Sequence, residues 1–383
     1  MNFELTEEHR RIRETLAAFA EREIRPFSAK WDKEETFPRH VIEKLGELGF
    51  LGVSLPERWG GGGADTISQV IVVEGLSRYD ASIGLTCAAH ISLASGHIAA
   101  FASDEHRDRL MPAMIRADKL GAWCLTEPGS GSDAGALKTR AVRAGDRYSI
   151  SGTKMFITNG TVGDVYVVMT LTGAASGREA ISAFIVERGT PGLSNGRRIE
   201  KLGLRASDTA EVIFDECSVP AGNLIGELGA GYRQMLAVLE AGRIGIAGFA
   251  AGIARGALEE AAAYAKQRVQ FGKPIADFQA IQWMLADMAA RIDASWALTC
   301  RAAALRDQGR PFGRESAMAK LYASETAMWS TTKAVQIHGG YGYISDFPVE
   351  RYMRDAKLSE IGEGTSEVQR MIIAKSILRD GYL

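Results

Sequence analysis

The chain has 383 residues, of which 46% are apolar and 24% charged, and its formal net charge is −2. This length allows two or three packed domains, and the small net charge gives no electrostatic reason to expect a nucleic acid or an anionic membrane as a partner. Four scattered cysteines without a CxxC pair favour reduced thiols in a cytoplasmic protein over a disulfide framework or a zinc site.

The N-terminal segment 1–25 is rich in Glu and Arg and lacks the apolar core of a secretory signal, so we expect no targeting segment. Thr6 before two glutamates predicts a helix start. Segment 81–103 contains no Asp, Glu, Lys or Arg, which predicts a helix buried on most sides, in the core or beside an apolar ligand. Because no run approaches 18 apolar residues, we expect no membrane span.

The hydrophobic period changes near residue 121 and again near residue 229. Short alternating or β-rich runs separated by turn residues predict an antiparallel β unit rather than a Rossmann sheet, and the long helical patterns that follow are typical of a bundle. The predicted fold class is α+β, with a helical domain (1–119), a middle antiparallel β-barrel or sandwich (120–228) and a C-terminal four-helix bundle (229–383).

Glu363 lies between Gly362 and Gly364, directly before a helix start at Thr365 and Ser366. Glycines on both sides allow a close approach of backbone and ligand, so the carboxylate could project from a tight bend into a pocket. Taken alone, this pattern fits a solvated loop glutamate equally well.

Two further stretches could bind a ligand. Segment 123–133 leaves a strand for a loop rich in glycine and hydroxyl groups, which could hold a phosphate or the edge of a heterocycle. Phe156 and Thr158 are two residues apart on a predicted strand, so they share a face suited to stacking on a planar ring and hydrogen-bonding its edge. Each stretch alone is also consistent with an ordinary turn cluster or a half-buried strand.

Five motifs in one order nevertheless resemble the acyl-CoA dehydrogenase family over essentially the whole chain. They are Cys124-Leu-Thr-Glu-Pro-Gly-Ser-Gly-Ser-Asp133, Lys154-Met-Phe-Ile-Thr-Asn-Gly160, Arg268-Val-Gln-Phe-Gly272, Gln336-Ile-His-Gly-Gly-Tyr-Gly342 and Glu363-Gly-Thr-Ser366. The resemblance implies an FAD enzyme that converts a saturated acyl-CoA to a trans-2-enoyl-CoA. Glu363 would take the α-proton and flavin N5 the β-hydride, and electrons would pass to electron-transferring flavoprotein.

The resemblance also implies which residues contact FAD. The contacts within the chain are Trp123, Leu125, Thr126, Ser132, Phe156, Ile157, Thr158, Gly364, Thr365, Ser366 and Glu367. Those that match positions reaching the FAD of a neighbouring subunit are Arg268, Gln270, Phe271, Phe278, Gln279, Gln336, Ile337, Gly339 and Gly340. An Arg suits a diphosphate because its planar fork pairs with two oxygens. The family's usual assembly is a homotetramer, and a shared site requires at least a dimer.

The substrate contacts implied by the resemblance are Ser132, Glu240, Arg243 and Gly364. In the isovaleryl and long-chain branches the catalytic glutamate occupies the position of Gly242, which cannot take a proton. Glu240 lies two residues earlier and so points about 200° away on a helix. Glu363 therefore keeps the role of base, and we expect its pKa to be raised by an apolar pocket.

The sequence favours a short-chain, butyryl-like acyl group. The uncharged segment 81–103 offers no cation for a dicarboxylyl-CoA, whereas Gly362, where related branches often carry Tyr, leaves room for a branched or cyclic acyl group. Three alternative functions are less consistent with the sequence. An acyl-CoA oxidase would be longer, and a nitroalkane oxidase would lack the glutamate at position 363. The intact flavin motifs and Glu363 oppose an inactive acyl-CoA-binding member. His90 and His97 fit packed, hydrogen-bonded histidines better than acid–base residues, and His338 falls inside an FAD motif.

Overall fold

The computed structural model describes residues 4–172 and 178–382. Its N-terminal part is helical, as predicted, and Thr6 caps the first helix by accepting a hydrogen bond from the His9 N–H. The helices are α1 (Glu7–Glu23), α2 (Ser28–Glu34), α3 (Arg39–Glu47), α4 (Thr66–Tyr79), α5 (Ala81–Ala88), α6 (Gly96–Phe101) and α7 (Asp104–Ile115). Between α5 and α6 the chain continues as a π-helical segment, η3 (Ala89–Ser95), so the uncharged stretch is one nearly continuous buried helix.

The middle part is a sheet of eight strands among the described residues, in the order β6-β7-β3-β2-β4-β5-β8, with β1 added beside β4. The strands are β1 (Gly121–Cys124), β2 (Arg140–Ala144), β3 (Arg147–Thr158), β4 (Val165–Thr172), β5 (Ile181–Glu187), β6 (Leu193–Arg198), β7 (Thr209–Pro220) and β8 (Leu224–Ile225). Most pairs are antiparallel, but β1 and β2 both run parallel to β4. The expectation of a purely antiparallel unit was wrong in this detail, since strand direction depends on which distant strands pair.

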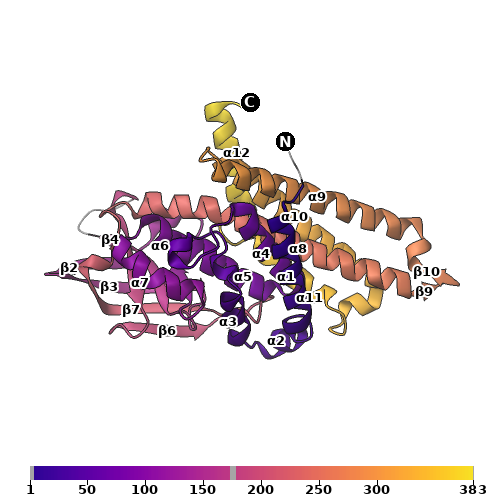
Figure 1. The fold of residues 1–383 in the computed structure, drawn as a ribbon, viewed down its shortest axis with the longest axis horizontal. Helices are drawn as coiled ribbons and strands as arrows, with labels where there is room; N and C mark the ends of the chain where they lie inside the picture. The colour runs from indigo at the N-terminus through magenta and orange to yellow at the C-terminus, as the bar shows by residue number, and fades with distance from the viewer. Residues whose placement is uncertain (1–3, 173–177, 383) are drawn as a thin grey trace.

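The C-terminal part begins with the long helix α8 (Gly231–Gln267), which packs against α4, α9 and α10. The other elements are β9 (Val269–Gln270), β10 (Lys273–Pro274), α9 (Gln279–Asp307), α10 (Gly313–His338), η8 (Gly339–Tyr343), α11 (Val349–Ala356), η9 (Lys357–Glu360) and α12 (Ser366–Asp380). Figure 1 shows the sheet at one end of the molecule's long axis and the β9–β10 hairpin at the other, with α8, α9 and α10 running between them.

Two helical segments, 81–101 and 231–267, are long and apolar enough to cross a membrane by length and composition alone. The sequence expectation of no membrane span considered only unbroken apolar runs, and these segments are interrupted by polar residues. In the structure 83% and 72% of their most apolar windows are buried inside the protein. They therefore have the burial of core helices, and they pack against each other where the N-terminal helices meet the bundle.

Candidate active site

Glu363 lies in a tight bend between η9 and α12. Glu363 has φ 52° and Gly364 has φ 92°, so two consecutive residues adopt the left-handed conformation. For a non-glycine residue this conformation costs of order 1–3 kcal/mol, which the surroundings must offset. As the sequence predicts, Thr365 caps α12, because its hydroxyl accepts a hydrogen bond from the Val368 N–H at 3.3 Å.

The bend directs the Glu363 carboxylate into the interior, against the glycine at position 242 of α8. A Cβ placed on Gly242 would come within 2.2 Å of Glu363 Oε2 and 3.1 Å of the Leu93 side chain. The Oε2 atom is buried and has no hydrogen-bond partner among the described residues. Burial raises the pKa of Glu363 to about 7, although the nearby Lys320 and Arg243 charges act in the opposite direction.

Arg243 follows Gly242 on α8 and is buried beside the same carboxylate. Burial lowers the pKa of its guanidinium, while Glu240 and Glu363 favour its charged form. Its Nε has no hydrogen-bond partner in the described part of the chain. Glu240 instead lies against the start of α10, where a Cβ on Gly313 would be 2.8 Å from its Oε1. Glu240 and Glu363 thus lie in different places, Glu240 against the start of α10 and Glu363 against Gly242.

Sequence reasoning missed Lys320, on α10. Its side chain is completely buried, and its ammonium group donates to the Gly364 carbonyl at 2.7 Å. Burial lowers the pKa of Lys320 to about 8, partly offset by the Glu363 charge. The one available signal was that Ala317 and Ala323, three residues before and after Lys320, place small apolar residues on the same helix face as the lysine.

Hydrogen bonds connect the two predicted flavin-binding stretches of the middle part, 123–133 and 154–160. The Met155 N–H donates to the Thr126 carbonyl at 2.8 Å. Below this contact, the buried Lys154 ammonium donates to Glu127 Oε1 at 2.8 Å and to the Leu125 carbonyl at 3.1 Å. A buried ion pair with further hydrogen bonds holds its geometry firmly, because separating the charges would leave each without compensation.

A β-bulge shapes the second stretch. The register of β3 against β7 shifts between Lys154 and Ile157, and Phe156 has φ 58°. Phe156 is 62% exposed and Thr158 is half-buried, whereas the Ile157 side chain between them is 2% exposed and packs into the sheet core. The structure thus places Phe156 and Thr158 on the outer face and separates the Ile157 side chain from them.

Trp123 is held by a chain of hydrogen bonds through His97. The indole N–H donates to His97 Nδ1 at 3.1 Å, and His97 Nε2 lies 3.1 Å from Gln234 Oε1. This arrangement requires a neutral His97 that carries its proton on Nε2, and burial lowers the pKa of His97 to about 4. His90 is also buried, between the Met114 carbonyl and the Gly121 N–H. Both histidines are packed and hydrogen-bonded, as expected.

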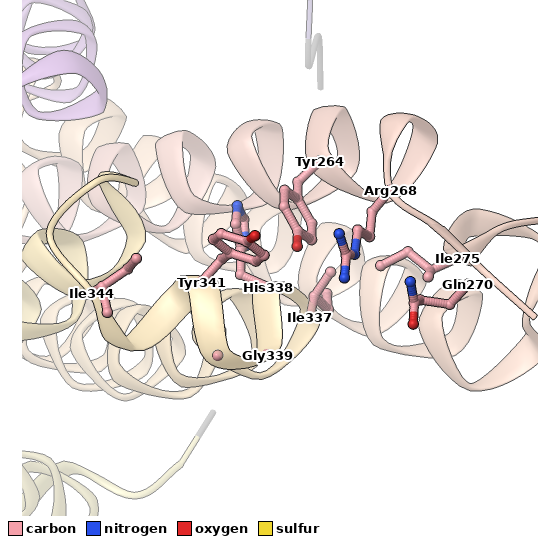
Figure 2. Close-up of a pocket in the computed structure, with 10 residues that line it drawn as sticks. Tyr264, Arg268, Gln270, Ile275, Ile337, His338, Gly339, Tyr341 and Ile344 are labelled. Atoms are coloured by element: carbon pink, nitrogen blue, oxygen red, sulfur yellow. The ribbon is translucent and has the colours of Figure 1, made fainter.

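The predicted contacts to the FAD of a neighbouring subunit lie around the β9–β10 hairpin, at the end of the molecule away from the sheet (Figure 1). A cavity of about 540 Å³ there is lined by Tyr264, Arg268, Gln270, Ile275, Ile337, His338, Gly339, Gly340, Tyr341 and Ile344. Figure 2 shows Tyr264 and Arg268 projecting from the end of α8 toward the turn that contains Gly339 and Tyr341. The Arg268 guanidinium stacks over the Tyr341 ring at 5.4 Å, and His338 stacks on Tyr264 at 4.2 Å.

Several predicted residues beside this cavity are strongly exposed. Phe271 is 93% exposed in a left-handed conformation, with Phe278 edge-on at 6.0 Å, and Gln279 and Gln336 are exposed as well. Ser132 and Glu367 are also exposed, but Ser132 belongs to the loop after β1 and Glu367 to the first turn of α12. A single chain therefore does not bring the two groups of predicted FAD contacts together.

The residues present fit a planar, anionic cofactor in parts. Near Glu363, the buried Ser366 Oγ and Gln369 Oε1 lack hydrogen-bond partners among the described residues, as do Glu363 Oε2 and Arg243 Nε. At the far cavity, a Cβ on either Gly339 or Gly340 would meet open space, so a ligand could approach the backbone closely. Unsatisfied buried polar atoms and an open glycine turn are the features expected where a ligand completes the structure.

Comparisons with known proteins agree over the whole chain. Residues 6–118, 122–217 and 229–378 match the N-terminal, middle and C-terminal domain models of acyl-CoA dehydrogenases. A short-chain specific acyl-CoA dehydrogenase of Clostridium acetobutylicum is 45% identical over 99% of this chain and 100% of its own length.

Two solved structures are similar in both fold and sequence. Butyryl-CoA dehydrogenase from Megasphaera elsdenii has a TM-score of 0.97 and is 41% identical over 99% of this chain and 100% of its own. A chain from work on the electron transferring flavoprotein of Acidaminococcus fermentans has a TM-score of 0.98 and is 45% identical over the same shares of the two chains. This protein therefore belongs to the acyl-CoA dehydrogenase family, flavoprotein oxidoreductases that act on CH–CH bonds.

Proposed function

We propose that the protein dehydrogenates a short-chain acyl-CoA, butyryl-like or branched, to its trans-2-enoyl-CoA, with Glu363 as the base that takes the α-proton. The observation that carries the proposal is the Glu363 carboxylate, which is buried against Gly242 with an unpartnered oxygen and a pKa raised to about 7. A carboxylate with its usual pKa near 4.3 would be a weak base. A base with a pKa near the working pH is both ionised and basic enough to act.

The chain's own groups have separate tasks in this scheme. Gly242 leaves the space in which the carboxylate sits, and the bend at Glu363 fixes the direction from which it meets the α-carbon. The Glu363 N–H would be one donor to the thioester oxygen, which acidifies the α-proton in the way that an oxyanion hole does. Arg243, with Ser132, Glu240 and Gly364, would contact the CoA part of the substrate.

FAD is the cofactor of the family and, when bound, would supply the acceptor for the β-hydride. We assign its ring to the surface formed by Trp123, Leu125, Thr126, Phe156 and Thr158, where Ile157 would contribute its backbone only. Gly364, Thr365, Ser366 and Glu367 would lie alongside. The cavity lined by Arg268, Gln270 and Gly339 lies by the β9–β10 hairpin, at the end of the molecule away from the sheet (Figure 1). These residues would therefore serve the FAD of a neighbouring subunit. This division supports an oligomer, for which we propose a homotetramer.

The substrate and the electron acceptor are inferred from chemistry and from the relatives. The buried helix 81–101 carries no Asp, Glu, Lys or Arg, which supports an uncharged acyl tail. The similar proteins of Clostridium and Megasphaera are a short-chain and a butyryl-CoA dehydrogenase. Electron-transferring flavoprotein is the proposed acceptor, in keeping with the similar chain from Acidaminococcus fermentans.

The test is anaerobic titration of the purified flavoprotein with butyryl-, isobutyryl- and octanoyl-CoA, following the loss of flavin absorbance. The wild type is expected to be bleached most readily by the two short substrates. Glu363→Gln should keep FAD and acyl-CoA binding but bleach at least about 10²-fold more slowly, the contribution typical of a positioned base. Glu47→Gln, the same change at an exposed residue of α3, is the matched control. Normal bleaching by Glu363→Gln would refute the assignment of the base.

A further inference from the structure

Lys320 is a buried cation that the proposed chemistry has not used. It lies on α10 with a fully buried side chain, and its hydrogen bond goes to the Gly364 carbonyl at 2.7 Å, one residue after the base. Removing an ammonium group from water is costly, so such a group is retained only where it is compensated. A methionine or leucine would fill this space more cheaply, which makes the charge itself the feature that requires explanation.

A second side chain shares the same carbonyl. Gln369, on α12, donates its Nε2 to the Gly364 oxygen at 2.8 Å and lies 3.4 Å from the Glu363 carbonyl. The bend is thus held by hydrogen bonds from two helices, α10 and α12. These hydrogen bonds offset the cost of the left-handed backbone at Glu363 and Gly364. Gln369 supplies a hydrogen bond without a charge, whereas Lys320 supplies both.

We propose that Lys320 is a positioning residue for the reaction, which holds the Glu363–Gly364 bend through the Gly364 carbonyl and whose positive charge keeps the Glu363 carboxylate ionised. The proposal rests on the proposed role of Glu363 as the base. It assigns Lys320 no contact with substrate or cofactor, and it separates two contributions, a hydrogen bond that Gln369 also makes and a charge that Gln369 lacks.

The charges around the pair determine the sign of the effect. The groups whose charges act on Lys320 are Glu363, Glu360, Glu367 and Arg243, and those that act on Glu363 are Lys320 and Arg243. Glu360 is already paired with Lys357, and Glu367 is exposed. Removing the Lys320 charge leaves Arg243 as the cation beside Glu363. The pKa of Glu363 should then rise above about 7, so that less of the base is ionised at neutral pH.

The experiment compares Lys320→Met with Gln369→Met by measuring, as a function of pH, the second-order rate constant for anaerobic flavin reduction at low butyryl-CoA. This constant reports the pKa of the free enzyme's base. In Lys320→Met the midpoint should move up by about one pH unit, since an opposite charge at close range shifts a pKa by about 1–3 units. The rate would fall about fivefold near pH 7 and about tenfold below pH ~6, and recover toward the wild-type value above pH ~9. Gln369→Met should lower the rate by a factor that is the same at every pH, so that the midpoint of the pH profile does not move.

The results distinguish an electrostatic role of Lys320 from a purely structural one. An unmoved midpoint in Lys320→Met, or an equal shift in Gln369→Met, would overturn the proposal and leave Lys320 a purely structural residue. If Lys320→Met does not fold, Lys320→Gln, which keeps an N–H donor without the charge, must show the same shift. FAD absorbance per chain and the melting temperature report folding for every variant. Failure of wild-type reduction by any acyl-CoA, or normal reduction in Glu363→Gln, would instead overturn the proposed function and this inference together.

Discussion

The pocket around Glu363 and the cavity around Arg268 are both built from predicted site residues, but they differ in how deeply their charged groups are buried and in how exposed their neighbours are. In the first, charged groups are buried and close together, and the Glu363 oxygen is unpartnered within the described chain. In the second, the guanidinium stacks on an open tyrosine, and the neighbouring Phe271 is 93% exposed. The first pocket has the burial that raises the pKa of the proposed base, whereas the residues beside the second are exposed to solvent.

This difference shows which part of the chemistry one chain can perform. Raising the pKa of a carboxylate needs a dry, low-dielectric environment, which the packing of α8, α10 and α12 supplies. Binding a diphosphate needs accessible donors and an accessible backbone, and the cavity lined by the half-buried Arg268 and the exposed Gly339 has both. The two requirements conflict, so they are met in different places: the Glu363 carboxylate lies among α8, α10 and α12, and Arg268 lies by the β9–β10 hairpin at one end of the molecule (Figure 1).

The largest expected effect comes from filling the space beside the base. Gly242→Ala would place a Cβ 2.2 Å from Glu363 Oε2, so the carboxylate must move. A misplacement of about 1 Å can cost about 10² in rate, and we expect a loss of that size in flavin reduction by butyryl-CoA. Stopped-flow absorbance under anaerobic conditions measures it.

The control for this change lies one turn further along α8. In Gly245→Ala the new Cβ would meet the flexible Ser92 hydroxyl at 3.1 Å, a contact that a small rotation relieves. Gly245→Ala should therefore stay within a few-fold of the wild-type rate. Equal losses in the two variants would mean that α8 tolerates no Cβ in general, and that the space at Gly242 has no special relation to Glu363.

A smaller effect is expected at the open cavity. Arg268→Ala removes the guanidinium proposed to reach the neighbouring subunit's diphosphate, and a hydrogen bond to a charged group contributes about 1.5–3 kcal/mol. The dissociation constant for FAD should rise at least about tenfold, measured by flavin released on dialysis and by titration of the stripped protein. Arg310→Ala, an exposed arginine after α9, is the control. Unchanged FAD retention in Arg268→Ala would contradict the diphosphate role and weaken the case for a shared site.

The sequence predicted the elements better than their contacts. Thr6 caps α1 and Thr365 caps α12, as predicted, because helix caps are local properties. The two parallel strand pairs and the bulge at Phe156 were not predicted, since both depend on pairing between distant strands.

At the site, the motifs pointed to Glu363 as the candidate base and did not point to Lys320. A lysine on a helix normally reaches solvent, and only the packing of a bend 44 residues away buries this one. Gly242 was recognised as a residue that could not be the base. The structure adds that the carboxylate occupies the space that a side chain at Gly242 would fill. This is a relation between α8 and a distant bend, which spacing along the chain does not contain.

The smallest expected effect concerns the acyl group, at the third glycine near the base. Gly362 has Leu358 as its nearest neighbour, with a new Cβ at 3.5 Å from the Leu358 carbonyl oxygen and 3.6 Å from its Cγ, ordinary contact distances. Gly362→Ala should therefore change little. Gly362→Tyr should narrow the space beside Glu363 and lower the rate with isobutyryl-CoA relative to butyryl-CoA by about tenfold, the lower end of the range that one methylene contributes to selectivity. The ratio of kcat/KM for the two substrates measures this change independently of any general loss of activity. If the ratio stays constant in Gly362→Tyr, the open space beside the base does not face the acyl chain, and the room for a branched substrate must come from another wall of the pocket.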